Sequence, residues 1–126
     1  MIKNYEEWVK QADYDIETAE CMLKSGRYIY TIFMSHLAIE KALKAIYTKK
    51  LTEMPPKNHS LIFFVEKLEL QMPQELYDFT YTLNRVSVPT RYPDDLNRIM
   101  KDYTEEKTKE IYENSKKVLA WIKTQL

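Results

Sequence analysis

The chain has 126 residues, 44% of them hydrophobic, with 19 basic and 19 acidic side chains. This length suits one domain whose core buries roughly two-thirds of the unfolded surface. A net charge of zero gives no general positive field for nucleic acid, so any nucleic-acid contact requires a local patch. Because Gly26 is the only glycine, the glycine-rich loops that cradle nucleotide phosphates are excluded.

Cysteine and histidine are scarce. The single cysteine, Cys21, excludes an internal disulfide, and with two histidines at unrelated spacings it fits no structural zinc pattern. We therefore expect neither a metal nor a cofactor. The N-terminal segment lacks the apolar stretch of a signal peptide, and no apolar run approaches the length of a membrane span. These features predict a cytoplasmic protein without a membrane partner, with residues 1–126 forming one domain.

The first predicted helix runs from about Asn4 to Lys24, because apolar residues recur on one broad side of this segment. Asn4 is suited to cap its start, and Gly26 is suited to end it. The connection to the next helix is only two or three residues long, which predicts an antiparallel pair. Ala12 and Ala19 would let the two helices approach closely.

Residues 28–50 are the most apolar helical segment, and they are apolar on two sides. One side holds Ile32, Ser35, Ile39, Ala42, Leu43 and Ile46, and the nearly opposite side holds Tyr30, Phe33 and Leu37. Such a helix is expected at the centre of a bundle. Glu40 and Lys44 lie one turn apart beside the second side, in the order that favours an ion pair. If another helix or chain covers this pair, losing one member costs more than the pair contributes.

The next helix is predicted after a loop. Residues 51–59 contain two prolines and several polar residues, so the preceding helix must stop there. Residues 60–70 have helical spacing of their apolar side chains, although the run Leu-Ile-Phe-Phe-Val also suits a strand. We prefer the helix, with Ser60 or Asn58 as its cap.

The C-terminal half is predicted to contain two more helices. Pro73 suits the first turn of a helix that continues through about Val86. Residues 87–98 are predicted to be a loop, because two prolines four positions apart disfavour a continuous helix. The last helix is expected over about residues 104–124. Together these segments predict an all-α, up-and-down four-helix bundle with an additional short helix.

Five pieces of the sequence resemble one family. They are Trp8-x3-Ala12-x2-Asp15-x3-Ala19, Gly26-Arg-Tyr28, Leu37-Ala-Ile-Glu40-Lys-Ala-Leu-Lys44-Ala, His59-Ser-Leu61 and Arg91-Tyr-Pro-Asp94. In this order they resemble the HEPN domain, the higher eukaryotes and prokaryotes nucleotide-binding family, over about residues 5 to 124. The resemblance implies a helical bundle like the substrate-binding subunit of nucleotidyltransferases, often a homodimer. It also implies a minimal nucleotidyltransferase as partner, in a prokaryotic toxin–antitoxin pair.

Many members of that family are metal-independent ribonucleases that use a closely spaced arginine and histidine from both chains of a dimer. Here Arg27 is followed by His36 only after eight intervening residues, so this motif is absent. Its histidine would be the natural proton-transfer group near neutral pH. Arg91-Tyr-Pro-Asp94 instead resembles a variant found in members without the full motif. The resemblance thus favours a nucleotide- or RNA-binding module over an enzyme. A ribonuclease with a non-standard site and a purely structural dimer are the alternatives.

The candidate phosphate site contains Arg85, Arg91 and Tyr92. Arg91 and Tyr92 would clamp a phosphate and stack a base, because a guanidinium matches phosphate oxygens and an aromatic ring accepts any base. The alternative is that Arg91 pairs with Asp94 or Asp95, while Tyr92 packs the loop onto the bundle. In a rearranged ribonuclease, Arg91 would stabilise the phosphorane and Tyr92 or His59 would transfer protons.

The remaining candidates have structural alternatives. His59 faces a ligand or bonds backbone groups at the start of a helix. His36 is expected to be a satisfied histidine of the core or an interface. Glu40, Lys44 and Asp94 are expected at an interface, either with a second chain or between the bundle and the Arg91 loop. Otherwise Glu40 and Lys44 are an ordinary exposed pair.

Overall fold

The computed structural model describes residues 4–126, and the regular secondary structure of this part of the chain is entirely helical. The helices are α1 (Tyr5–Lys24), α2 (Tyr28–Leu51), α3 (Leu61–Lys67), α4 (Gln74–Arg91), α5 (Leu96–Asp102) and α6 (Glu105–Lys123). The all-α bundle is therefore confirmed, with two short helices rather than one. Within residues 4–126, no helix combines the length and apolar character needed to cross a bilayer.

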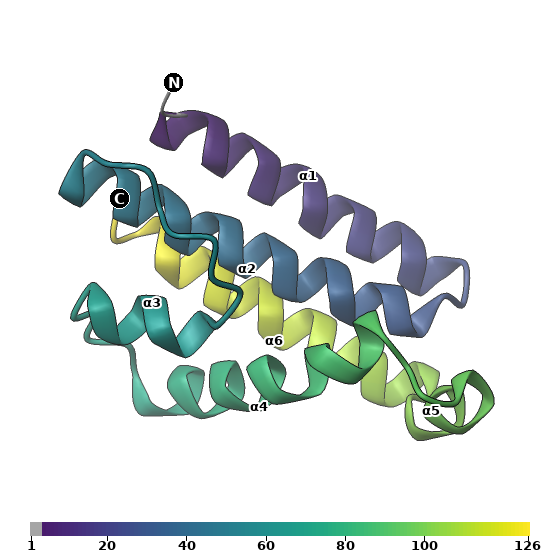
Figure 1. The fold of residues 1–126 in the computed structure, drawn as a ribbon. Coiled ribbons are helices and arrows are strands. Elements are labelled where there is room, and N and C mark those ends of the chain that lie inside the picture. The colour runs from purple at the N-terminus through teal and green to yellow at the C-terminus, as the bar shows by residue number, and fades with distance from the viewer. Residues whose placement is uncertain (1–3) are drawn as a thin grey trace.

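Helices α1 and α2 form an antiparallel pair (Figure 1). The Asn4 side chain accepts a hydrogen bond from the Glu7 N–H at 2.8 Å, which confirms the predicted cap. The chain reverses through Gly26, whose φ of +78° is a conformation that other residues rarely adopt. Ala12 and Ala19 are fully buried, so the two backbones approach closely.

Helix α2 is the centre of the molecule, since it packs against α1, α3, α4, α5 and α6. Its first predicted apolar side is buried, whereas Phe33 and Leu37 on the second side are only partly covered and Tyr30 is exposed. The core around α2 includes Ile32, Ile39, Leu43 and Ile46 of α2, Phe64 of α3, Leu83 of α4 and Val118 and Ile122 of α6. Both predictions for α2, its length and its central place, are confirmed.

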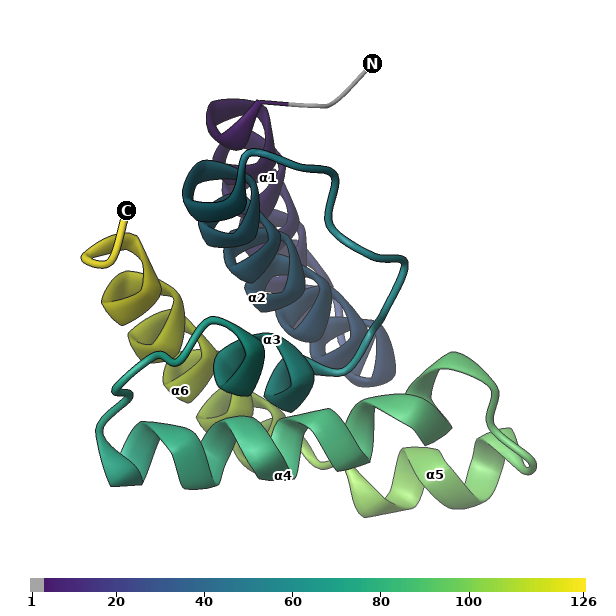
Figure 2. The same ribbon diagram turned by 60° about the vertical axis from the view of Figure 1, so that its left-hand side comes forward.

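Helix α3 confirms the helical interpretation of residues 60–70, although it is shorter than predicted. Ser60 Oγ accepts a hydrogen bond from the Phe63 N–H at 3.2 Å, and Asn58 Oδ1 accepts one from the Ser60 N–H at 2.8 Å. The next amide, Leu61 N–H, donates to Asn84 Oδ1 of α4 at 2.7 Å. Figure 2 shows the result, with α3 held between α2 and α4.

The prediction of a loop over residues 87–98 is wrong. Helix α4 continues through Pro89 to Arg91, and α5 follows after a short connection that contains Pro93. Pro89 lies in the last turn, where its missing N–H costs the helix one backbone hydrogen bond. The turn is held by Thr90, whose buried hydroxyl donates to the Ser87 carbonyl at 2.5 Å. Asp95 caps α5 by accepting from the Arg98 N–H at 3.1 Å.

Candidate functional site

A buried carboxylate lies at the centre of the candidate site. Glu40 on α2 is 2% exposed, and a buried charge is stable only when it is paired. Its partners come from α2, from the loop before α3 and from the end of α4. Lys44 Nζ lies 3.1 Å from Oε2, His59 Nδ1 3.2 Å from both carboxylate oxygens, Arg91 Nη2 3.7 Å from Oε1 and His36 Nδ1 3.8 Å from Oε1. We call these five side chains the Glu40 cluster.

Lys44 forms a buried ion pair with Glu40. Its ammonium lies 5.7 Å from the ring centre of Trp8 and 5.9 Å from that of Phe64, within cation–π range of both. The Lys44 side chain is only 10% exposed, so the Glu40–Lys44 pair is desolvated. The alternative of an ordinary exposed pair is therefore wrong, and the pair meets the Arg91 segment of the same chain.

Arg91 enters the cluster from the last turn of α4. Its guanidinium carbon lies 4.8 Å from the ring centre of Phe33, and its Nη2 lies 3.3 Å from His36 Nδ1. Because a guanidinium only donates, His36 Nδ1 is the acceptor in this hydrogen bond. All ion pairs and hydrogen bonds of Arg91 with residues 4–126 use Nη2. Its Nε and Nη1 donors are thus left for another acceptor.

His36 is a neutral structural group. Burial lowers its pKa to about 4, Glu40 opposes this effect, and Arg91 adds to it. The Asn84 side chain accepts a hydrogen bond from the ring, which also favours the protonated form. At neutral pH the ring is uncharged and almost fully buried, so it is unsuited to proton exchange with a ligand. The prediction of a satisfied core histidine is confirmed.

His59 differs from His36 because its side chain is exposed, although its Nδ1 is bound to a buried carboxylate. Its side chain is 63% exposed, while Nδ1 bonds the Glu40 carboxylate. Within the described residues, Nε2 makes no hydrogen bond. The backbone amides at the start of α3 are bonded by Asn58 and Ser60, so the alternative of a histidine that bonds them is wrong. A carboxylate that holds one imidazole nitrogen orients the other toward solvent.

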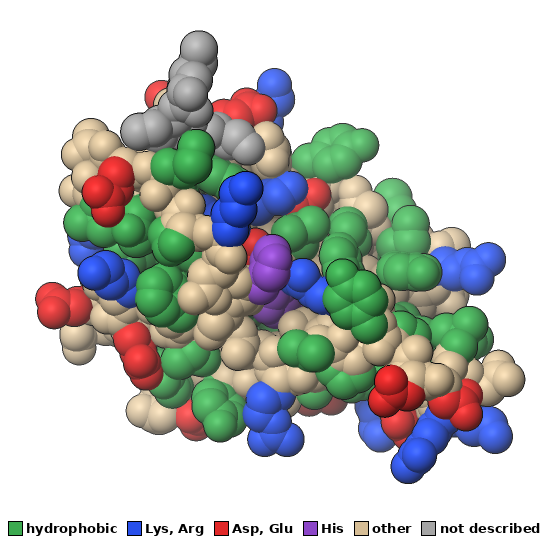
Figure 3. All heavy atoms as spheres, in the orientation of Figure 1, with side chains coloured by type: hydrophobic (Ala, Val, Ile, Leu, Met, Phe, Trp, Pro, Cys, Tyr) green, Lys and Arg blue, Asp and Glu red, His purple; other side chains and the backbone are tan. Residues whose placement is uncertain are grey.

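The Glu40 cluster has a surplus positive charge. Lys44 and Arg91 contribute two cations against one carboxylate, and His36 is neutral. On a chain with zero net charge, this is the kind of local patch that an anionic ligand requires. Figure 3 shows histidine and basic side chains together in the middle of one face, with hydrophobic side chains beside them.

Two predicted residues lie next to the cluster but point elsewhere. Tyr92 is 83% exposed, so its ring does not pack the loop onto the bundle. Asp94 is exposed and makes no ion pair with the residues that the structure describes, while Asp95 caps α5. The predicted alternative in which Arg91 pairs with Asp94 or Asp95 is therefore wrong, because Arg91 pairs with Glu40.

The structure does not bring Arg85 to the cluster. It is exposed on α4, and six helical steps place it about 120° around the axis from Arg91. Sequence reasoning missed two contacts, those of His59 with Glu40 and of Arg91 with His36. Neither had a usable signal, because the residues are far apart in the chain and lie on a loop or beyond a proline.

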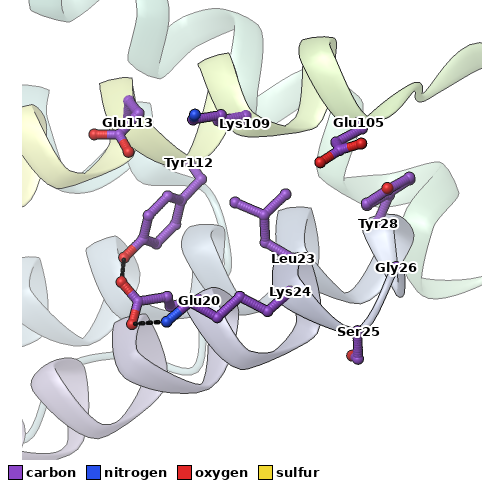
Figure 4. Close-up of a pocket in the computed structure, with 10 residues that line it drawn as sticks. All are labelled: Glu20, Leu23, Lys24, Ser25, Gly26, Tyr28, Glu105, Lys109, Tyr112 and Glu113. Atoms are coloured by element: carbon purple, nitrogen blue, oxygen red, sulfur yellow. Dashed lines mark hydrogen bonds and ion pairs between the residues drawn. The ribbon is translucent and has the colours of Figure 1, made fainter.

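A separate groove of about 580 Å³ lies between α1 and α6 (Figure 4). Two of its charged side chains, Glu20 and Lys24, pair with each other. The Tyr112 hydroxyl donates to Glu20 Oε2 at 3.2 Å, and Lys24 Nζ lies 3.4 Å from Glu20 Oε1. Burial and the Glu20 carboxylate raise the pKa of Tyr112 to about 12. None of the residues that line this groove belongs to the Glu40 cluster.

Two of the comparisons with known proteins name the same family. The family model of the HEPN domain matches residues 5–125. The crystal structure of TT1696 from Thermus thermophilus is similar, with a TM-score of 0.84 and 25% identity over 97% of this chain and 98% of that one. ST0689, an archaeal HEPN homologue, has a TM-score of 0.78 and 28% identity over 98% of each chain. No curated protein matches the sequence. Since the family model spans nearly the whole chain, the protein belongs to the HEPN domain family.

Proposed function

We propose that this HEPN domain binds the phosphate of a nucleotide or of RNA at Arg91. The supporting observation is that Arg91 is anchored through Nη2, while Nε and Nη1 have no partner among residues 4–126. Nε–H and Nη1–H point to different edges of the guanidinium, and each can donate a single charge-assisted hydrogen bond to a phosphate oxygen. A guanidinium already held on Phe33 loses less conformational entropy on binding than a free side chain would.

The neighbours of Arg91 support this assignment. Lys44 and Arg91 share the single carboxylate of Glu40, so one positive charge of the cluster remains uncompensated for a ligand. Tyr92, the next residue, presents a ring to solvent on which a base can stack. The proposal keeps Arg91 and Tyr92 from the predicted phosphate site and leaves Arg85 out.

The test is a titration of the protein with AMP and with a short single-stranded RNA. Arg91→Ala should weaken binding by at least about tenfold, because charge-assisted hydrogen bonds are each worth about 1.5–3 kcal/mol. Arg91→Lys, which keeps the charge but lacks the Nε and Nη1 donors, should also bind more weakly than the wild type. Arg85→Ala is the matched control on the same helix. If it weakens binding as much as Arg91→Ala does, the site is wrongly placed.

We also propose that the domain acts as the partner of a minimal nucleotidyltransferase in a toxin–antitoxin-type pair. Family membership and the absent nuclease motif support this role. The test is the neighbouring reading frame. If it encodes a small nucleotidyltransferase, the two proteins expressed together should co-purify as a stable complex. Separate elution of the two proteins would contradict the proposal.

A second candidate function, metal-independent RNA cleavage at a non-standard site, is favoured by His59. Its Nε2 is open to solvent and lies in the same cluster as Arg91. In this reaction Nε2 takes the proton of a ribose 2′-hydroxyl, and the oxygen bonds to phosphorus. The 5′-oxygen then leaves and is protonated by water, while Arg91 stabilises the charge on the phosphorane. The products are a 2′,3′-cyclic phosphate and a 5′-hydroxyl.

RNA cleavage is tested with wild type, His59→Asn and Arg91→Ala. Loss of general base catalysis should lower the rate by about 10²–10⁴-fold in His59→Asn. If wild type and variants cleave RNA at equal rates, any cleavage comes from a contaminant. The cleavage function is then rejected, and only the binding function remains.

A further inference from the structure

His59 is the one histidine whose ring reaches solvent. Its side chain is 63% exposed, whereas the other histidine, His36, is almost completely buried. Nδ1 of His59 lies 3.2 Å from both oxygens of Glu40, and a carboxylate only accepts hydrogen bonds. The ring proton is therefore on Nδ1, and the lone pair of Nε2 is left facing solvent.

The loop that carries His59 is fixed on both sides of this residue. Earlier in the loop, the Tyr47 hydroxyl of α2 donates to Glu53 Oε1 at 3.0 Å. The side chains of Asn58 and Ser60, the two neighbours of His59, accept hydrogen bonds from backbone amides at the start of α3. The ring is thus oriented before any reactant arrives, which lowers the entropic cost of a reaction at Nε2.

Basic groups surround the carboxylate that holds the ring. Lys44 Nζ lies 3.1 Å from Glu40 Oε2, and Arg91 Nη2 lies 3.7 Å from Oε1, an oxygen that also contacts His59. Figure 3 shows histidine beside basic side chains on this face. An anion that approaches Nε2 therefore meets positive charge, while the carboxylate lies at the other ring nitrogen.

We propose that Nε2 of His59 is a phosphoryl acceptor whose donor is a small acyl phosphate. The lone pair of Nε2 attacks phosphorus and forms a P–N bond. The bond between phosphorus and the acyl oxygen breaks, and its electron pair leaves with the carboxylate product. The ring keeps its Nδ1 proton and becomes positively charged, and the Glu40 carboxylate stabilises this imidazolium.

An acyl phosphate suits this site because its leaving group is a carboxylate, which departs without a proton from the protein. The other histidine of the cluster, His36, is buried and could not supply one. The modification goes beyond the proposed binding and cleavage functions, since it requires neither a nucleotide nor RNA.

The test is to label the protein with acetyl phosphate, and with phosphoramidate as a second donor, in the absence of nucleotide. Trypsin separates the two histidines, because His36 lies in the peptide 28–41 and His59 in the peptide 58–67. In the folded protein, the His59 peptide should gain a phosphoryl group that is lost in acid and kept in alkali, as a P–N bond is. The His36 peptide should remain unmodified.

Protein unfolded in urea is the reference, because both histidines are then exposed. Labelling of His59 should be at least about tenfold faster in the folded protein, since the carboxylate and the fixed ring activate Nε2 only there. Glu40→Gln and Arg91→Ala should lower the folded rate, with circular dichroism to verify that each variant is folded. Lys57→Ala, which removes an exposed charge from the same loop, should leave the rate unchanged.

Equal labelling rates for His59 in folded and unfolded protein would mean a merely exposed histidine and would overturn the proposal. A label that survives acid would be an ester on a hydroxyl, such as that of Ser60, and would overturn it as well. Labelling by phosphoramidate but not by acetyl phosphate would overturn the acyl phosphate as donor. Failure of AMP to bind at Arg91 would reject the phosphate site alone, because the labelling uses no nucleotide.

Discussion

Glu40 is the residue on which the site depends. Its buried carboxylate bonds Lys44 and His59 and lies near Arg91, so three segments of the chain meet at one charge. Without this carboxylate, two cations would remain in a poorly solvated place. Removing one member of a buried charge pair is costly for this reason.

We expect Glu40→Ala to lower the free energy of unfolding by about 3–5 kcal/mol. Urea unfolding monitored by circular dichroism measures the change. Glu113→Ala is the matched control, because Glu113 pairs with Lys116 at 3.9 Å and both side chains are about half exposed. Such a surface pair contributes at most about 1 kcal/mol. Similar losses in the two variants would contradict a desolvated cluster.

His36 should make stability depend on pH. Its folded-state pKa of about 4 lies below the ordinary 6.5, so the unfolded chain binds more protons between these values. Stability from this group is therefore complete above pH 6.5 and is lost as the pH falls towards 4. The full effect is about 3 kcal/mol.

The measurement for His36 is the free energy of unfolding at several pH values between 7 and 4. Carboxylates also titrate at the acidic end, so the difference between wild type and His36→Asn isolates the histidine. The variant should be less stable at pH 7 and should have a flatter profile. If the two profiles are parallel, burial of His36 does not control its protonation.

At the scale of elements, the end of α4 shows what sequence patterns miss. Two prolines in residues 87–98 predicted a loop, yet only Pro93 lies outside a helix. Pro89 lies in the last turn, where Thr90 donates a hydrogen bond to Ser87 of the same helix and Arg91 contacts α2. This local hydrogen bond and the tertiary contacts of Arg91 offset the cost of the proline.

Pro89→Ala should stabilise the protein. The substitution restores an N–H that can donate to the Arg85 carbonyl, and Pro89 is exposed, so little packing is lost. The greater freedom of the unfolded alanine chain offsets part of this gain, which leaves about 1–2 kcal/mol. Thermal unfolding measures it, with Pro56→Ala in the preceding loop as a control outside any helix. A lower melting temperature for Pro89→Ala would show that the ring itself holds the turn.

At the scale of the whole molecule, sequence patterns were sufficient to predict the helical bundle and its central helix. The two apolar sides of α2 predicted its place, and the spacing of Glu40 and Lys44 predicted their ion pair. Apart from His36 and Glu40, which lie one turn apart on α2, the other contacts of the site join residues 19 or more positions apart, such as His59 with Glu40. A repeating pattern describes neighbours on one helix, so it carries no information about such pairs.

We expect the protein to form a homodimer through Val88 at the exposed end of α4. Val88 is large, apolar and exposed, and it lies one turn before Tyr92, which stays open to solvent. Analytical ultracentrifugation should show a dimer for the wild type and a monomer for Val88→Glu. Tyr81→Glu, on the same helix, should remain dimeric. A monomeric wild type at all concentrations would rule out the homodimer.

The Asn84 side chain connects the Arg91 side of the site with the loop that carries His59. The oxygen of Asn84 accepts the first amide of α3, Leu61 N–H, while the same side chain bonds the ring of His36, which in turn bonds Arg91. His59 precedes Leu61 by only two residues. We therefore expect a ligand that binds Arg91 to perturb the start of α3 and the loop that contains His59 as well. The hydrogen–deuterium exchange rate of the Leu61 amide should therefore change when a ligand binds Arg91, although Leu61 does not contact Arg91.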